Sequence, residues 1–163
     1  MAVAAFALTA SAQVSPGDSF NVTNTVNNAT AINNYPTNAP GTNGVTLNTG
    51  QAVNVANYAE VGVLLTGQIA GASNGIVNVS FIRSLKPSVP SAASDWETSS
   101  TMTVSASTDS GGRLYWMTNL PSYWVRPARY IGVSLITNTS PGTSSLTNFS
   151  ISVGKKIIPV TWP

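Results

Sequence analysis

Apolar and polar residues alternate with a period of two in several short segments after residue 44, which is typical of β-strands that bury one face. The alternation is clear at 45–47, at 53–55 and over 76–84. Residues 58–69 are too apolar for a half-exposed strand, so we expect a strand that is covered on both faces. Asn74-Gly75 predicts a hairpin connection between the segments 58–69 and 76–84, because asparagine and glycine tolerate the positive φ that such turns require.

The second half of the chain continues the same pattern. Met102, Val104 and Ala106 alternate with serine and threonine. Further strands are expected at 114–117, 130–136, 146–153 and 156–162. The last of these is expected at a sheet edge, because Pro159 lacks a main-chain donor. No segment carries a helical stripe, and about eight to ten short strands predict an all-β fold: an antiparallel β-sandwich or jelly roll with an extended N-terminal arm.

The chain has 163 residues, the length of one domain. We divide it into a neutral N-terminal arm with the first strands, residues 1–43, and a sandwich domain, residues 44–163. Its first 13 residues are mostly apolar or small and contain no basic residue, so we expect an ordered arm rather than a removed leader. Residues 19–59 carry no charged side chain. We interpret them as lying against another protein surface; the alternative is an extended arm or a set of irregular strands.

Composition removes most kinds of catalytic and metal site. Histidine and cysteine are both absent, which excludes imidazole bases, thiol nucleophiles and thiolate zinc sites. Asp95 and Glu97 could be compared with the carboxylate pair of a glycosidase. Because the flanking loop is polar, we favour a solvated strand start with Trp96 in the core. No calcium-loop pattern occurs. We therefore expect no enzyme, no catalytic, cofactor-binding or metal-binding residues, and no cofactor.

Charge is sparse and unevenly placed. Charged residues make up 7% of the chain and the net charge is +2, yet residues 110–163 carry five basic residues and no acidic one. This polarity would serve an acidic partner or a head-to-tail contact between copies, or it reflects only where loops fall. The basic residues are too few for a nucleic-acid-binding face, and no apolar run is long enough for a membrane span. We expect neither partner.

Four aromatic residues, including Trp116 and Trp124, lie within ten residues of one another and close to three arginines. On a loop they would stack on sugar rings or anchor a protein interface; otherwise alternate members face the core. The segment 120–127 is the best candidate for a partner-contacting loop. The residues that we expect to contact a partner are Val3, Phe6, Leu8, Tyr35, Trp116, Tyr123, Trp124, Arg126 and Arg129.

Four segments carry a resemblance to a known group of proteins. They are Phe-Ile-Arg-Ser at 81–84, Asp-Trp-Glu-Thr at 95–98, Arg-Tyr-Ile-Gly-Val at 129–133 and Leu-Thr-Asn at 146–148. In pattern and composition, residues 58–163 resemble small all-β virion proteins of tailed bacteriophages, most of all capsid decoration (cement) proteins. The resemblance implies a β-sandwich or jelly roll on the outer capsid surface. It also implies binding to the major capsid protein and to copies of itself, often as trimers, with an N-terminal arm that grips the capsid.

Two functions of different classes fit these features. The first is a structural virion protein, a decoration or minor capsid protein that stabilises the shell by bridging neighbouring subunits. Few charges leave little repulsion between copies, and neutral side chains form hydrogen bonds across an interface without the cost of burying ions. The alternative is a carbohydrate-binding β-sandwich for adhesion to a host surface. Its binding residues would be Trp96, Tyr115, Trp116, Tyr123 and Trp124.

Overall fold

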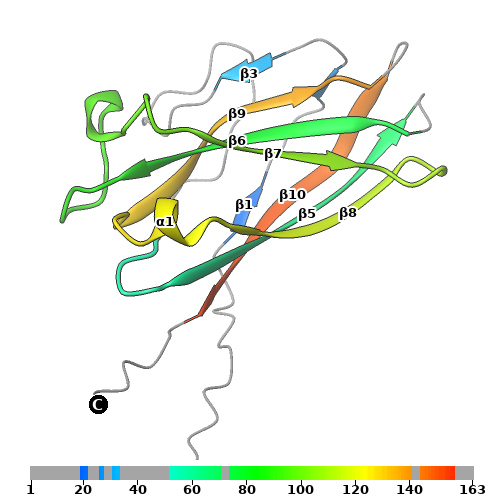
Figure 1. The fold of residues 1–163 in the computed structure, drawn as a ribbon. Helices are drawn as coiled ribbons and strands as arrows, with labels where there is room; N and C mark the ends of the chain where they lie inside the picture. Colours follow the sequence, from blue (N-terminus) through cyan, green and yellow to red (C-terminus); the bar gives the residue numbers. More distant parts are fainter. Residues whose placement is uncertain are drawn as a thin grey trace, which may run out of the picture.

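The computed structural model describes residues 19–21, 26–27, 31–33, 52–70, 74–140 and 144–156 (Figure 1). These residues form ten strands and two short helical turns. In chain order the elements are β1 (Ser19–Asn21), β2 (Val26–Asn27), β3 (Ala31–Asn33), β4 (Val53–Asn54), β5 (Glu60–Ala70), β6 (Ile76–Ser84), the 3-10 turn η1 (Ala93–Asp95), β7 (Met102–Ser107), β8 (Arg113–Leu120), α1 (Ser122–Val125), β9 (Tyr130–Asn138) and β10 (Ser145–Lys156).

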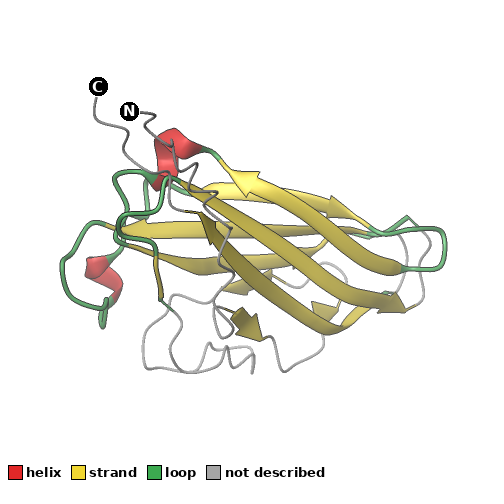
Figure 2. Ribbon diagram, turned by 90° about the horizontal axis from the view of Figure 1, so that it is seen from below, coloured by secondary structure: helices red, strands yellow, loops and turns green. Residues whose placement is uncertain are grey.

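The strands form two antiparallel sheets of five strands each. The first sheet has the order β1-β10-β5-β8, with β2 also paired to β10; the second has the order β3-β9-β6-β7, with β4 also paired to β9. The two sheets lie one over the other, as the view in Figure 2 shows. The prediction of an all-β antiparallel sandwich is confirmed.

The core fills the space between the sheets with alternate side chains of the long strands. From β5 these include Val63 and Leu65, and from β6 they include Val77, Val79 and Phe81, all of them fully buried. The face predicted for 76–84 is therefore confirmed. Complete burial of an apolar side chain of this size contributes roughly 1.5–3 kcal/mol to stability. Burial of these side chains is therefore the main interaction that holds the two sheets together.

Strand β5 differs from the prediction because only one of its faces is covered. Gly62, Leu64 and Thr66 lie on the opposite face of the sheet and are half-buried. The high apolar content of 58–69 suggested cover on both sides. The structure instead places Leu64 on the outer face, between Met117 of β8 and Ser152 of β10.

The connection between β5 and β6 is also not the predicted hairpin. Both edges of β5 are occupied by β10 and β8, and β6 lies in the other sheet, so the chain crosses from one layer to the other. Asn74 does adopt the positive φ of a turn, at 57°. A Cβ on Gly75 would lie 2.5 Å from Cδ1 of Ile69 and 2.6 Å from Oγ of Ser140. A side chain at position 75 would therefore force Ile69 and Ser140 to move.

A bulge in β10 keeps two successive core residues on the inner face. The register with β5 shifts between Thr147 and Ser150, and Asn148 takes a φ of 50° there. Leu146 and Phe149 consequently both point inward and are buried. An extra residue in one strand of a pair has this effect, because it reverses the alternation beyond that point.

Parts of the N-terminal segment belong to the sheets. β1 and β2 pair with β10, and β3 pairs with β9. Phe20 on β1 is buried in the core. The contact residues expected at Val3, Phe6, Leu8 and Tyr35 lie outside the described residues, as does the predicted strand beyond Lys156. In the described part of the chain, no helix is both long and apolar enough to cross a membrane.

Candidate interaction surface

Strand β8 forms one edge of the first sheet. One side of β8 pairs with β5, and the other side has no neighbouring strand among the described residues. Beyond the start of β8, the N–H of Ile69 donates to the carbonyl oxygen of Gly112 at 2.7 Å. Hydrogen-bonded pairs alternate along an antiparallel ladder, so the register between β5 and β8 fixes the direction of every main-chain group. The N–H and C=O groups of Tyr115, Met117 and Asn119 point away from β5.

Both ends of this free edge are defined by neighbouring residues. At the start, the carbonyl oxygen of Arg113 accepts from the N–H of Asp109 at 2.9 Å, and the N–H of Arg113 donates to Oδ1 of Asp109 at 2.8 Å. At the other end, Pro121 has no N–H to offer. The open part of the edge therefore covers residues 114–120.

Large apolar side chains are exposed along the same strand. Tyr115 and Met117 are 74% and 75% exposed, and Trp116 is 37% exposed. Leu114 and Leu120, at the two ends, are buried and anchor β8 to the core. Trp116 shares their face of the sheet, but it is only partly covered. Exposed apolar residues gathered on one element mark an interaction site more often than single ones do.

The sheet face beside β8 carries no charge at its centre. Leu64 and Thr66 of β5 lie next to Met117 and Tyr115, and Ser150 and Ser152 of β10 lie beyond them. Among these residues, Thr66 and Ser150 share a hydroxyl–hydroxyl hydrogen bond of 2.7 Å. Among the described residues of this face, charges appear only at the margins, at Arg113 and at the ion pair between Lys156 and Glu60, where N and O are 3.3 Å apart. We call β8 and this face the β8 surface.

Helix α1 places one of the predicted contact residues outside and the other inside. Tyr123 is 75% exposed, whereas Trp124 is 3% exposed. The prediction that Trp124 contacts a partner is therefore wrong. One turn of helix directs adjacent residues to different sides. Trp124 and Val125 are both buried in the core, whereas Tyr123 points to solvent. Arg126 and Arg129, after α1, are exposed as a contact residue requires.

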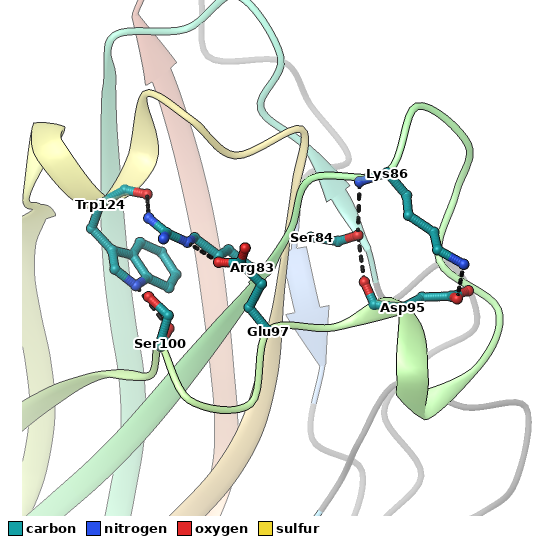
Figure 3. Close-up of polar contacts among 7 residues, drawn as sticks. All are labelled: Arg83, Ser84, Lys86, Asp95, Glu97, Ser100 and Trp124. Carbon is teal, nitrogen blue, oxygen red and sulfur yellow. Dashed lines mark hydrogen bonds and ion pairs between the residues drawn. The ribbon is translucent and has the colours of Figure 1, made fainter.

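Polar contacts hold Trp124 in place (Figure 3). Its indole Nε1–H donates to the carbonyl oxygen of Ser100 at 2.9 Å. A guanidinium N–H of Arg83 donates to the carbonyl oxygen of Trp124 at 2.8 Å, and Nε of Arg83 donates to Oε2 of Glu97 at 2.6 Å. Trp96 is buried in a separate small cluster with Ile82 and Tyr130, so the prediction that it lies in the core is confirmed.

The carboxylates that were compared with a glycosidase pair have structural partners. Glu97 pairs with Arg83, and Asp95 accepts from the ammonium group of Lys86 and from the N–H groups of Ser91 and Ala92. These bonds, the one from Lys86 first, lower the pKa of Asp95 to about 2. A general acid of a glycosidase needs a raised pKa. Within the described ranges, no group of three or more acidic residues is placed to hold a metal ion.

Sequence reasoning had missed Met117, and it had grouped Tyr115 with the aromatic residues without choosing it as a contact residue. A period of two would have placed both on one face of the strand. The missing information was that no strand of the described ranges pairs with the far edge of β8.

No family model matches the chain, and neither a curated protein nor a solved structure matches it. Statements about function therefore rest on the β8 surface and on the sequence.

Proposed function

We propose that this protein is a structural virion protein, a decoration or minor capsid protein on the outer surface of a phage shell, which it stabilises by bridging neighbouring subunits. One observation carries the proposal. Strand β8 exposes Tyr115, Trp116 and Met117 at the edge of a sheet whose adjoining face has no charge at its centre. The resemblance to decoration proteins gives this surface its expected partners, the major capsid protein and further copies of the chain.

The chemistry of the β8 surface suits permanent cover by another protein. Aromatic and methionine side chains are enriched at the centre of protein interfaces, and charged residues are depleted there. Around them, the hydroxyl groups of Thr66, Ser150 and Ser152 offer hydrogen bonds. Burying such groups avoids the loss of ion hydration, which costs several kcal/mol for each buried charge.

The test uses particles of the phage that encodes the chain. Particles purified on a density gradient should contain the chain in a fixed ratio to the major capsid protein, measured by quantitative mass spectrometry. Particles made without the chain should release their DNA at a lower temperature, and added chain should restore the wild-type value. A chain that is absent from purified particles would contradict the proposal.

A matched pair of variants tests the surface. Tyr115→Ala with Met117→Ala removes two exposed apolar side chains from β8. Thr103→Ala with Ser105→Ala removes two exposed hydroxyls from β7, the edge strand of the other sheet. The β8 pair should fail to restore the release temperature, whereas the β7 pair should restore it. The same response from both pairs would mean that β8 is not the contact strand.

The exposed rings of Tyr115, Trp116 and Tyr123 also favour a second candidate, a carbohydrate-binding module, because flat aromatic rings stack on sugar rings. The burial of Trp96 and Trp124 removes two of the five aromatic residues on which this function would rest. Binding to a glycan array that disappears on Trp116→Ala would support this candidate. An array with no binding above background would remove it.

A further inference from the structure

We propose that two copies of this chain pair through their β8 strands, antiparallel and about a two-fold axis at Met117, so that the first sheet continues from one copy into the other. The inference adds a partner to the β8 surface of the proposed function and rests on it to that extent. Its main support is the symmetry of the free edge of β8.

The free main-chain groups of β8 are arranged symmetrically. They belong to Tyr115, Met117 and Asn119, and Met117 is the middle one. In an antiparallel pair, these groups bond only to residues whose own groups also point outward. The pairing that uses all of them places Met117 opposite Met117 of the second copy, and Tyr115 opposite Asn119. A shift of two residues toward the start of β8 would place Asn119 opposite Arg113, whose N–H and C=O are already bonded to Asp109.

The side chains fit the same register. On the inner side, Leu114 would lie opposite Leu120 of the second copy, and Trp116 opposite Thr118, which covers the partly exposed indole. On the outer side, Tyr115 and Met117 of both copies would form one apolar cluster. Apolar cross-strand pairs of this kind stabilise two paired strands.

Charge also favours the antiparallel arrangement. Residues 114–120 contain no charged side chain, and Arg113 is the only charged residue of β8. In the proposed pair, the two Arg113 residues are eight positions apart along the ladder, roughly 27 Å at about 3.4 Å per residue. That separation is well beyond the Debye length of about 8 Å at physiological salt. A parallel pair would place the two guanidinium groups side by side.

Strand β8 lacks the features that keep other edge strands apart. Natural edge strands are protected by lysine, proline, bulges or short length. Residues 114–120 contain no lysine and no proline. They pair with β5 without a register shift, and they belong to a strand of eight residues. β7, at the edge of the second sheet, differs in its exposed side chains. Thr103 and Ser105 are hydroxyl residues that already bond to Ser80 and Asn78, at 2.8 and 2.6 Å. β7 therefore offers hydrogen bonds but little apolar area.

A two-fold pair would be useful on a shell. Each surface of the chain outside β8 would then be present twice in the dimer, and the two copies of it would face two neighbouring subunits of the shell. One dimer could bridge them without a second kind of binding surface.

The first experiment blocks the free edge with proline. Because the N–H of Met117 points away from β5, Met117→Pro removes a donor from the free edge and none from the sheet. Ser105→Pro is the matched control, because its N–H also points outward: Thr108 donates to Gly75 at 3.0 Å, which sets the alternation of β7. Sedimentation equilibrium should give twice the chain mass for the wild type and for Ser105→Pro. It should give the single mass for Met117→Pro, and circular dichroism should show that all three are folded.

The second experiment reads the register directly and does not depend on the proline variants folding. The chain has no cysteine, so every disulfide comes from an introduced one. Met117→Cys should cross-link to itself, because Cα atoms directly opposite each other in a hydrogen-bonded pair are about 5.5 Å apart. Tyr115→Cys alone should not, because its two copies would be roughly 14 Å apart. Tyr115→Cys combined with Asn119→Cys should cross-link again.

The outcomes separate this inference from the proposed function, since both experiments use the purified chain without particles. A monomer at all concentrations, a trimer mass, or equal cross-linking of Met117→Cys and Ser105→Cys would overturn the β8 pairing and leave the particle test to be judged alone. A β8 dimer from a chain that is absent from particles would support the pairing and remove the virion function.

Discussion

Arg83 on β6 and Trp124 on α1 are joined by two contacts: a hydrogen bond of 2.8 Å from the guanidinium to the carbonyl oxygen of Trp124, and a distance of 5.8 Å between Cζ and the centre of the indole ring. Because Glu97 holds the same guanidinium from the other side, the orientation of α1 is fixed. Trp124 therefore packs inward and Tyr123 faces outward. The polar cluster in Figure 3 thus decides which aromatic residue is available to a partner.

Replacement of the two neighbouring aromatic residues should have opposite consequences. Trp124→Ala should lower the free energy of unfolding by about 3–5 kcal/mol, because it leaves a cavity in the core and an unpaired carbonyl at Ser100. Tyr123→Ala should change it by no more than about 0.5 kcal/mol. Urea denaturation followed by fluorescence measures both. Equal losses would show that Tyr123 is also part of the packed structure.

The lowered pKa of Asp95 predicts a loss of stability in acid. Its carboxyl has a pKa of about 2 in the folded chain against an ordinary value of 3.8. A group with a lower pKa in the folded state stabilises the fold above its unfolded pKa, and this contribution is lost as the pH falls from about 4 to about 2. The melting temperature of the wild type should decline more steeply over this range than that of Asp95→Asn. Parallel declines would contradict the assignment.

Two glycines in the first sheet should respond differently to alanine. A Cβ on Gly67 would lie 3.2 Å from Cδ1 of Leu146 and 3.4 Å from Cα of Phe149, where the bulge brings β10 close. Gly67→Ala should therefore cost about 1–3 kcal/mol. Gly154→Ala meets nothing within 4 Å. It should be neutral or slightly stabilising, because it reduces the freedom of the unfolded chain. Thermal unfolding of the two variants would detect a reversed order.

Deletion of residues 1–17 should affect assembly more than folding. The deletion leaves β1 and the buried Phe20 intact, so the melting temperature should stay close to that of the full chain. Recovery of the chain with particles should fall, because the resemblance to decoration proteins implies an N-terminal arm that grips the capsid. A large drop in melting temperature with unchanged particle binding would assign the segment to the fold itself.

The strands could be predicted from the sequence wherever one face is buried and the other is exposed to solvent. Val77, Val79 and Phe81 show this well, because serine and asparagine lie between them. Which strands pair could not be predicted in the same way. β5 and β10 are neighbours although residues 71–144 separate them. The Asn74-Gly75 turn was interpreted as a hairpin because a local pattern does not show that both edges of β5 are occupied.

The candidate surface was predictable in part for the same reason. A cluster of aromatic residues was evident in the sequence. Tyr123 and Trp124, however, lie within a single helical turn, where the alternation rule for strands does not apply. Trp116 is partly exposed because, in the part of the chain that the structure describes, no strand lies beside the outer edge of β8. The absence of a neighbour leaves no mark on the residues of the strand itself.

The place of β10 in the first sheet has a consequence for biosynthesis. β10 is the last strand among the described residues, and it separates β1 and β2 from β5. While the ribosome is still making the chain, β1 and β2 lack the strand with which they pair, and one edge of β5 has no partner. The sheet closes after translation has passed residue 156, so the nascent chain must remain unaggregated until then.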